Sequence, residues 1–152
     1  MKVLILGGYG TFGGRLATLL ADEARLELVI AGRDLARAEA FAATLGGGAR
    51  KTPACFDRDG DLGAQLAPLA PDLVVDASGP FQAYGANPYR VVEACIARGI
   101  SYLDLADGSD FVAGIAAFDA AARARGVFVL SGVSSFPVLT AAVMRELGRE
   151  MS

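Results

Sequence analysis

The sequence has no histidine, only two cysteines, and no long apolar run. Without histidine the chain lacks the commonest metal ligand and the commonest general base, so we expect no metal site. Cys55 and Cys95 lie too far apart for a CxxC motif and predict two reduced, buried thiols. No segment approaches the ~20 apolar residues of a membrane span. The formal net charge of −3 gives no basic field for nucleic acid or an anionic membrane. These features predict a soluble, cytoplasmic protein.

Short apolar runs alternate with helical patterns along the whole chain. The runs are nearly continuous in hydrophobicity, which is typical of strands covered by helices on both faces of a parallel sheet. The alternation predicts an α/β fold with a doubly wound, mostly parallel six-stranded sheet, the Rossmann arrangement of NAD(P)-binding domains. The runs are VLIL (3–6), LELVIA (26–31), PACF (53–56), LVVDA (73–77), ISYLDL (100–105) and VFVL (127–130).

Capping residues and breakers predict where several helices begin and end. Asp34 is expected to cap the second helix, and Asn87 and Pro88 are expected to start the helix that Gly99 ends. Asp61 can cap a helix that Pro68 should end early. Apolar spacing predicts a further helix from Phe111 to Ala122 and a last one from Pro137. The stripe of that last helix comprises Val138, Leu139, Ala142, Val143 and Leu147.

The run GGYGTFGG at 7–14 lies between the first predicted strand and the first predicted helix. It fits GxGxxG at Gly8, Gly10 and Gly13, and equally GxxGxxG from Gly7. In this context one glycine permits the turn, Gly10 admits a pyrophosphate and Gly13 allows close helix packing. The free N–H groups of residues 10–13 then face the diphosphate. The alternative is a structural turn. The candidate cofactor-binding residues here are Gly7, Gly8, Tyr9, Gly10, Thr11, Phe12 and Gly13.

The end of the second strand bears on the choice of cofactor. NAD-binding domains place an acid there for the ribose 2′-hydroxyl, whereas this chain has Arg33. Its guanidinium can pair with a 2′-phosphate, which favours NADP over NAD. The alternative is a solvated arginine beside the Asp34 helix cap. Asp57, after the third strand, is a candidate contact for the adenine amino group or an ordinary loop acid.

The loops after the later strands should line the same crevice. Ser78, Gly79, Pro80 and Phe81 are expected to pack on the riboses of the cofactor, or else to form a plain turn. The loop 131–137 is expected to lie near the nicotinamide.

Catalytic candidates are few. Asp104, Asp107 and Asp110 could act as acid or base, or they could cap a helix and coat a solvated loop. A Tyr-x-x-x-Lys pair is excluded, because neither Lys2 nor Lys51 follows a tyrosine by four residues. No nucleophile–base pair can be assembled from this chain.

These segments together resemble the NADP-binding domain of saccharopine dehydrogenase-like oxidoreductases. The specific part is the combination of VDASGPF…YG with CIARGISYLDL, alongside the glycine loop, AGR and VFVLSGVSSFP. The resemblance implies residues 1–136 as the dinucleotide-binding domain, with 137–152 starting a helix that leads to an absent substrate and dimerisation domain. It also implies Arg33 at the ribose phosphate, Ser78–Phe81 beside the nicotinamide, and a homodimer of the full-length protein.

Two functions are consistent with these features. The first is hydride transfer between NADP(H) and a small carbonyl, imine or activated alkene in a longer enzyme, with this fragment alone inactive. The alternative is a non-catalytic NADP(H)-binding module that senses redox state. The two differ in whether substrate-binding residues follow Ser152 in the natural chain.

Overall fold

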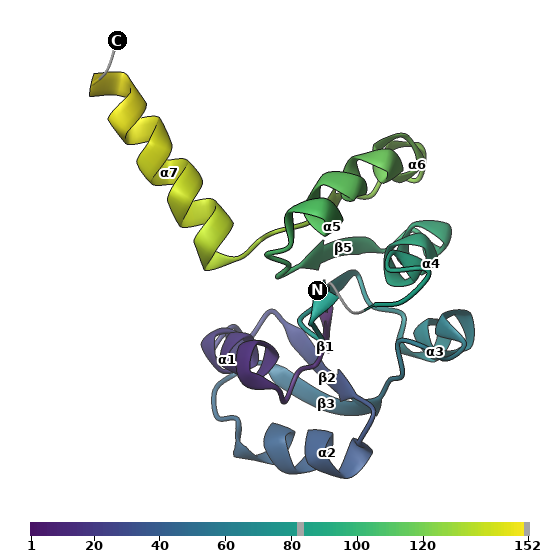
Figure 1. Cartoon of the computed structure of the whole chain (residues 1–152). Helices are drawn as coiled ribbons and strands as arrows, with labels where there is room; N and C mark the ends of the chain where they lie inside the picture. Colours follow the sequence, from purple (N-terminus) through teal and green to yellow (C-terminus); the bar gives the residue numbers. More distant parts are fainter. Residues whose placement is uncertain (82–83, 151–152) are drawn as a thin grey trace.

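The chain forms a six-stranded parallel sheet with helices on both faces (Figure 1). The computed structural model describes residues 1–81 and 84–150, with side chains at all of these positions except 135–138 and 150. The strand order is β3-β2-β1-β4-β5-β6, and every neighbouring pair is parallel. This confirms the predicted fold. The strands are β1 (Lys2–Leu6), β2 (Glu27–Gly32), β3 (Arg50–Cys55), β4 (Leu73–Asp76), β5 (Ser101–Asp104) and β6 (Val129–Leu130).

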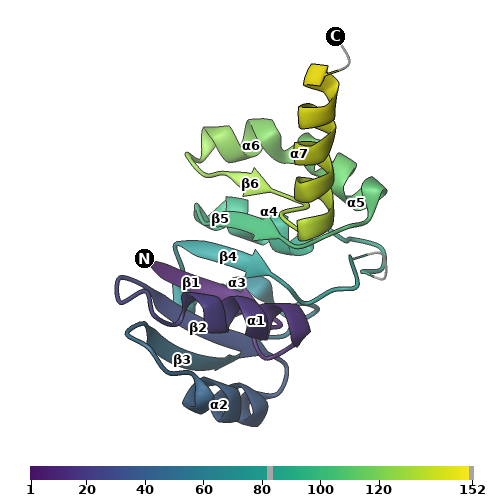
Figure 2. The same ribbon diagram turned by 90° about the vertical axis from the view of Figure 1, so that its left-hand side faces the viewer.

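Helices cover both faces of the sheet, which explains the continuous apolar runs. Successive residues of β1 enter different cores: Val3 and Ile5 pack toward α1 and α2, and Leu4 and Leu6 toward α3 and α4. Figure 2 shows the layers from the side. The helices are α1 (Thr11–Leu20), α2 (Leu35–Thr44), α3 (Leu62–Leu69), α4 (Arg90–Arg98), α5 (Ser109–Gly114), the 3-10 helix η2 (Ile115–Phe118), α6 (Asp119–Ala124) and α7 (Ser135–Glu150).

The chain reverses its direction of winding between β1 and β4. β2 and β3 extend the sheet on one side of β1, and β4, β5 and β6 extend it on the other. The loops after β1 and β4 therefore separate at the carboxyl edge of the sheet. In doubly wound folds this switch point opens the ligand-binding crevice.

Several predicted boundaries shift in the structure. Asn87 does not cap α4: its Oδ1 accepts from the Tyr89 N–H at 3.2 Å, and the helix begins only at Arg90. Pro68 does not end α3 early, because near the last turn a missing N–H removes only one helical bond. The predicted 111–122 helix is interrupted by η2. Asp34, Asp61 and Gly99 occupy the predicted caps.

The two cysteines differ in environment. Both are free, as predicted, but only Cys95 is buried. Burial raises the pKa of the Cys95 thiol to about 12. Cys55 is exposed because it is the last residue of the edge strand β3, where the covering layers end.

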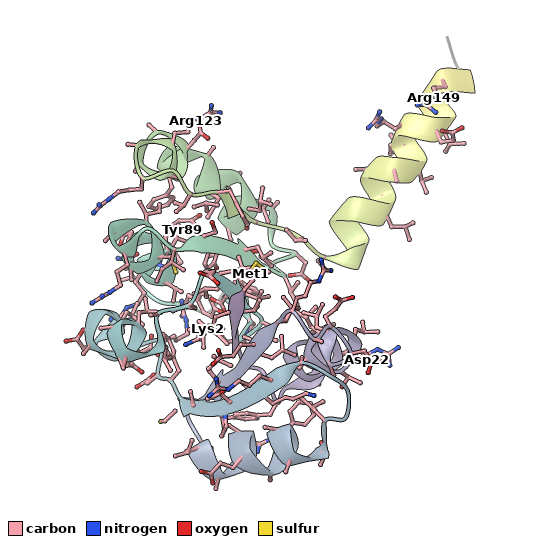
Figure 3. All side chains as sticks on the ribbon, turned by 180° about the vertical axis from the view of Figure 1, so that it is seen from behind. Met1, Lys2, Asp22, Tyr89, Arg123 and Arg149 are labelled. Atoms are coloured by element: carbon pink, nitrogen blue, oxygen red, sulfur yellow. The ribbon has the colours of Figure 1, made fainter. Side chains whose placement is uncertain are left out.

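The last helix, α7, extends away from the body of the domain (Figures 1 and 2). It begins at Ser135, two residues before the predicted start. Its apolar side chains are exposed, with Leu139 at 65% and Leu147 at 51%. Figure 3 shows the side chains of α7, including Arg149, standing clear of the packed body. Val138 of the predicted stripe lies outside the described side chains. No helix in the described ranges is long and apolar enough to cross a membrane.

Candidate functional site

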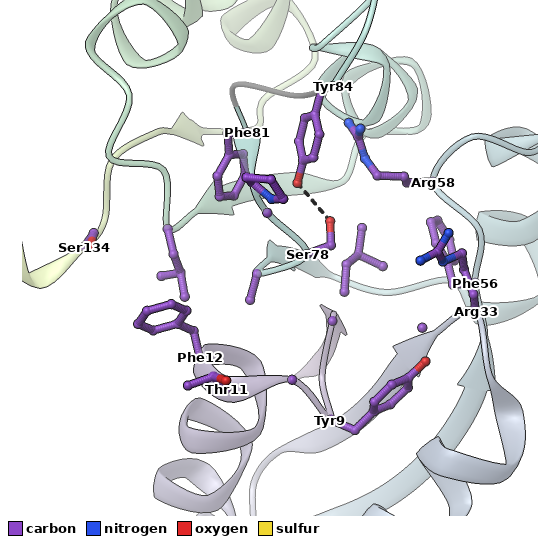
Figure 4. Close-up of a pocket in the computed structure, with 18 of the residues that line it drawn as sticks. Tyr9, Thr11, Phe12, Arg33, Phe56, Arg58, Ser78, Phe81, Tyr84 and Ser134 are labelled. Atoms are coloured by element: carbon purple, nitrogen blue, oxygen red, sulfur yellow. Dashed lines mark hydrogen bonds between the residues drawn. The ribbon is translucent and has the colours of Figure 1, made fainter.

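A cleft of about 1080 Å³ opens at the carboxyl edge of the sheet (Figure 4). Its walls come from the loops after all six strands. Phe12 and Ser134 lie at one end, and Tyr9 and Arg33 lie at the other. Predicted site residues in the lining are Gly7, Tyr9, Gly10, Thr11, Phe12, Arg33, Ser78, Gly79, Pro80, Phe81 and Asp107. Lining residues that sequence reasoning did not select include Arg37, Arg58, Asp59 and Tyr84.

Three glycines of the loop after β1 are required by packing. Gly7 has φ +71°, and a Cβ there would lie 2.8 Å from the Ala77 carbonyl oxygen. Gly8 donates its N–H to Ala31 at 3.0 Å, and a Cβ would approach the Ile5 carbonyl oxygen to 2.8 Å. A Cβ on Gly13 would collide with the Gly7 carbonyl group. Gly8 and Gly13 are buried and lie outside the cleft lining.

Gly10 has a different role, because it lies on the cleft wall. Its φ of −82° is available to any residue, so no backbone strain requires glycine there. A Cβ would meet only the Gly7 carbonyl oxygen, at 3.1 Å, and would otherwise occupy the cleft. The Gly10 N–H is not free as predicted: it donates to Gly7 at 2.8 Å.

The amides that follow Gly10 remain available for a ligand. Gly14 donates the first helical bond to the Gly10 carbonyl at 2.8 Å. Thr11, Phe12 and Gly13 therefore form the first turn of α1, where N–H groups lack helical acceptors. Such a helix start, with its positive dipole end, is suited to a phosphate group.

The end of β2 gathers cationic and aromatic groups at one end of the cleft. Asp34 caps α2 by accepting from the Arg37 N–H at 3.0 Å, and its own N–H donates to the Tyr9 hydroxyl at 3.0 Å. The Arg37 guanidinium lies 5.0 Å from the centre of the Tyr9 ring. Arg33 is exposed and lines the cleft.

Arg37 could have been recognised from its position in the sequence. It is the third residue of α2, a helix with no acidic residue in its first turn. A cation there opposes the positive end of the helix dipole. This unfavourable placement is a signal for an anion at the same helix end.

The segment after β3 presents Arg58 and Asp59 to the cleft in place of the predicted Asp57. The Asp57 carboxylate instead accepts from the Asp59 N–H at 3.1 Å, outside the lining. Asp59 forms an ion pair with Arg90 at 3.7 Å. The Arg58 guanidinium lies 3.1 Å from the centre of the Tyr84 ring, so it connects this segment to the loop after β4.

The loop after β4 forms the wall opposite the glycine loop. Phe81 is buried, with its ring centre 5.1 Å from that of Tyr84 and 5.2 Å from that of Phe111. The Gly79–Pro80 peptide is cis. The Tyr84 hydroxyl lies 2.9 Å from the Ser78 Oγ, and both groups face the cleft (Figure 4).

The three acidic candidates after β5 occupy different environments. Asp104 is fully buried and outside the lining; its Oδ1 accepts from Ala106, Ser131 and Gly132 at 2.9 to 3.0 Å. It therefore joins the loop after β5 to the loop after β6. Asp107 lines the cleft, and Asp110 is exposed in the first turn of α5.

A fourth carboxyl group, Asp76, was not selected from the sequence. It ends β4 and is fully buried. Burial raises its pKa above the ordinary 3.8, against the opposing effects of hydrogen bonds from Ser78 and the charge of Arg58. An acid inside the apolar run LVVDA, followed two residues later by serine, was the available signal.

The described residues of the site form no cluster suited to a metal. Within residues 1–81 and 84–150, no three His, Cys, Asp or Glu residues group closely enough to hold an ion. The parallel sheet, the glycine-rich turn into α1 and the cleft at the switch point define a dinucleotide-binding domain of the Rossmann type.

Comparison with known families identifies the chain more narrowly. It belongs to the family of the saccharopine dehydrogenase NADP binding domain, whose model matches residues 3–130. The family is one of NADP-binding domains of oxidoreductases, which confirms the resemblance drawn from the sequence. No curated protein matches the chain.

Solved structures share the fold. Saccharopine dehydrogenase (L-Glu forming) from Saccharomyces cerevisiae superposes with a TM-score of 0.66 at 21% identity, over 97% of this chain and 31% of that one. GenD2 from gentamicin A biosynthesis, solved with NAD, superposes with a TM-score of 0.54 at 28% identity, over 87% of this chain and 34% of that one. An NAD binding oxidoreductase from Klebsiella pneumoniae superposes with a TM-score of 0.54 at 25% identity, over 86% of this chain and 34% of that one. The chain thus spans about a third of each of these relatives.

Proposed function

We propose that the cleft binds NADP(H), with the diphosphate on the first turn of α1. Gly10 supports this placement, because its missing Cβ leaves the cleft wall open beside the N–H groups of Thr11 and Phe12. The adenosine then lies toward Tyr9 and Arg33, and the nicotinamide toward the end that Ser134 lines.

The observation that carries the choice of NADP over NAD is the pair of arginines at the end of β2. Arg33 and Arg37 both line the cleft, and Asp34, the acid that follows Arg33, is engaged as the helix cap. A hydrogen bond to a charged group contributes about 1.5–3 kcal/mol, or roughly tenfold to a hundredfold in affinity. We therefore assign the ribose 2′-phosphate to Arg33 and Arg37.

The residues at the other end would orient the reacting ring. When bound, NADPH supplies a hydride to its substrate. Pro80, Phe81, Val133 and Ser134 line the cleft, and we place them around the nicotinamide. These groups would hold the ring and exclude water from it.

The substrate site is proposed to lie outside this domain. We propose that the domain acts within a longer oxidoreductase, in which a second domain binds a small carbonyl, imine or activated alkene and forms a homodimer. The chain's span of 31% of the yeast enzyme supports this proposal. Residues 1–136 would then bind the cofactor without turnover on their own. The two free cysteines support a reducing, cytoplasmic location.

A pair of glycine variants tests cofactor binding. Gly10→Val should abolish NADPH binding measured by calorimetry, because its side chain would occupy the diphosphate position. Gly46→Val is the matched control: Gly46 has nothing within 4 Å of an added Cβ and lies outside the cleft lining. Circular dichroism establishes that both variants are folded. Undiminished NADPH binding by folded Gly10→Val would overturn the proposed diphosphate site.

A further inference from the structure

Three hydrogen-bonded side chains lead from the buried core to the cleft. Asp76 is fully buried, and its Oδ1 accepts from the Ser78 Oγ at 2.6 Å and from the Ser78 N–H at 2.9 Å. The Ser78 Oγ lies 2.9 Å from the Tyr84 hydroxyl. Ser78 and Tyr84 both line the cleft, opposite the glycine loop (Figure 4).

Asp76, at the buried end of this series of hydrogen bonds, lies in an unusual environment for a carboxylate. The Asp76 Oδ2 is buried and has no hydrogen-bond partner among the described residues. Asp104 faces it in register from the neighbouring strand, is also fully buried, and likewise has an unpartnered Oδ2. Burying a carboxylate beside a second acidic side chain is costly, which favours a proton on Asp76.

The charged and titratable groups around Asp76 come from several elements. Arg58, after β3, favours its ionised form, whereas Asp104 on β5 opposes it. Cys95 on α4 and Tyr102 on β5 also interact with its charge. Desolvation is the largest effect, so the pKa of Asp76 is raised. The carboxyl group therefore releases its proton at a higher pH than an exposed aspartate does.

The direction of the hydrogen bonds depends on that proton. Ionised Asp76 only accepts, so Ser78 must donate to it. The Tyr84 hydroxyl then donates to the Ser78 Oγ at 2.9 Å, and it also makes a longer contact of 3.5 Å with the Asp76 Oδ1 itself. Tyr84 then offers only an acceptor to the cleft. Protonated Asp76 can donate to Ser78, Ser78 to Tyr84, and the Tyr84 proton then points into the cleft. A proton on the Asp76 Oδ1, the oxygen that contacts Ser78, can thus reverse the direction of both hydrogen bonds.

We propose that Asp76, Ser78 and Tyr84 form a proton relay that supplies the cleft; its use in a reduction rests on the proposed function. When hydride reaches the carbon of a C=O or C=N bond, the heteroatom needs a proton. That atom takes the Tyr84 proton, Tyr84 takes the Ser78 proton, and Ser78 takes the Asp76 proton. One new O–H or N–H bond forms on the substrate, and Asp76 remains as a carboxylate.

Tyr84 is suited to pass protons while remaining a phenol. Burial raises the pKa of its hydroxyl above the ordinary value of 10.0, and the charge of Asp76 raises it further. Its ring is held by Phe81 on one side and by the Arg58 guanidinium 3.1 Å from its centre. Tyr84 is the proton donor in this proposal, and Ser78 and Asp76 act through it.

Carbon-13 NMR on the protein itself tests, without any substrate, whether the proton on Asp76 is coupled to the Tyr84 hydroxyl. The Asp76 Cγ and the Tyr84 Cζ are labelled, and Asp76→Asn and Tyr84→Phe assign their signals. We expect the Tyr84 signal to move with the same pH midpoint as the Asp76 signal. In Ser78→Ala, the Asp76 signal should still titrate. The change in the Tyr84 chemical shift at the Asp76 midpoint, here called the Tyr84 step, should be largely lost. Ser78→Cys, a weaker donor, replaces the alanine variant if that one is unfolded.

Ser131→Ala is the matched control, because it removes a hydroxyl bond of 2.9 Å from the neighbouring Asp104. It should leave the Tyr84 step unchanged. A Tyr84 signal with no step at the Asp76 midpoint would overturn the relay. A change of equal size in the Tyr84 signal without the Ser78 hydroxyl would also overturn it, since that change would come from the direct 3.5 Å contact between Tyr84 and Asp76 or from charge acting through space. Separately, failure of the wild type to bind NADPH would overturn the cofactor proposal but not the measured coupling.

Discussion

At the scale of single residues, the glycines after β1 differ in what each requires. Gly13 is needed for the fold, because an added Cβ would meet the backbone of Gly7, which cannot rotate away. Gly10 lies on the cleft wall, where an added Cβ would meet only the Gly7 carbonyl oxygen, at 3.1 Å, and would otherwise enter the space of the proposed ligand. Gly13 is therefore required for stability of the fold, whereas Gly10 is required for binding of the proposed ligand.

Gly13→Ala should lower the free energy of unfolding by roughly 1–3 kcal/mol, because overpacking against backbone forces the loop to shift. Urea denaturation measures the change. Gly148→Ala is the control, since Gly148 has nothing within 4 Å of an added Cβ, and it should not be destabilised. Equal stability of the wild type and Gly13→Ala would mean that α1 does not pack as described.

Asp76 gives a prediction about pH and stability. Its pKa is raised in the folded chain above the ordinary 3.8. Between 3.8 and that raised value, the folded chain keeps a proton that the unfolded chain has released. The contribution of Asp76 to the free energy of unfolding therefore falls as pH rises through this window. Asp76→Asn cannot titrate, so the free energy of the wild type minus that of the variant should decrease with pH. A difference that increases through the window would refute the raised pKa.

At the scale of elements, the sequence predicted strands better than helix starts. A strand buried on both faces is a continuous apolar run, and β1, β2 and β4 lie where such runs were found. The predicted start of α4 was wrong, because the Asn87 side chain can accept a hydrogen bond within a turn as well as at a helix cap.

The site was predictable in part for a related reason. Residues within a loop that follows a strand could be assigned to the carboxyl edge, as for Gly10, Arg33 and Ser78. Contacts between loops could not. The stacking of Arg58 on Tyr84 joins segments after β3 and β4, and its geometry depends on how far each loop reaches over the sheet.

The helix α7 carries a prediction of its own. Leu139, Val143, Met144 and Leu147 are exposed on it, and we propose that this apolar stripe forms an interface. Leu139→Asp with Leu147→Asp should raise solubility and leave NADPH binding unchanged. Ala141→Asp with Gly148→Asp adds the same charge off the stripe and should raise solubility less. Unfolding of the leucine double variant in a denaturation experiment would show instead that these side chains belong to the core.

At the scale of the whole molecule, the strand order β3-β2-β1-β4-β5-β6 gives the cleft two chemically different ends. Arg33 and Arg37 lie toward β2 and β3, where a phosphate would be recognised. Phe81 and the relay from Asp76 lie toward β4 and β5, where a proton could be delivered. The proposed direction of the cofactor follows from this asymmetry, with the phosphorylated ribose at the arginine end.

The most direct test of that orientation compares NADPH with NADH by calorimetry on the wild type and on Arg33→Ala. The wild type should bind NADPH more tightly by about tenfold to a hundredfold, the contribution of a charged hydrogen bond to the 2′-phosphate. Arg33→Ala should reduce that preference, with Arg37 keeping part of it, while the affinity for NADH stays the same. Arg50→Ala, an exposed arginine at the start of β3 and outside the cleft lining, should keep the preference. Equal affinities of the wild type for NADPH and NADH would contradict the account.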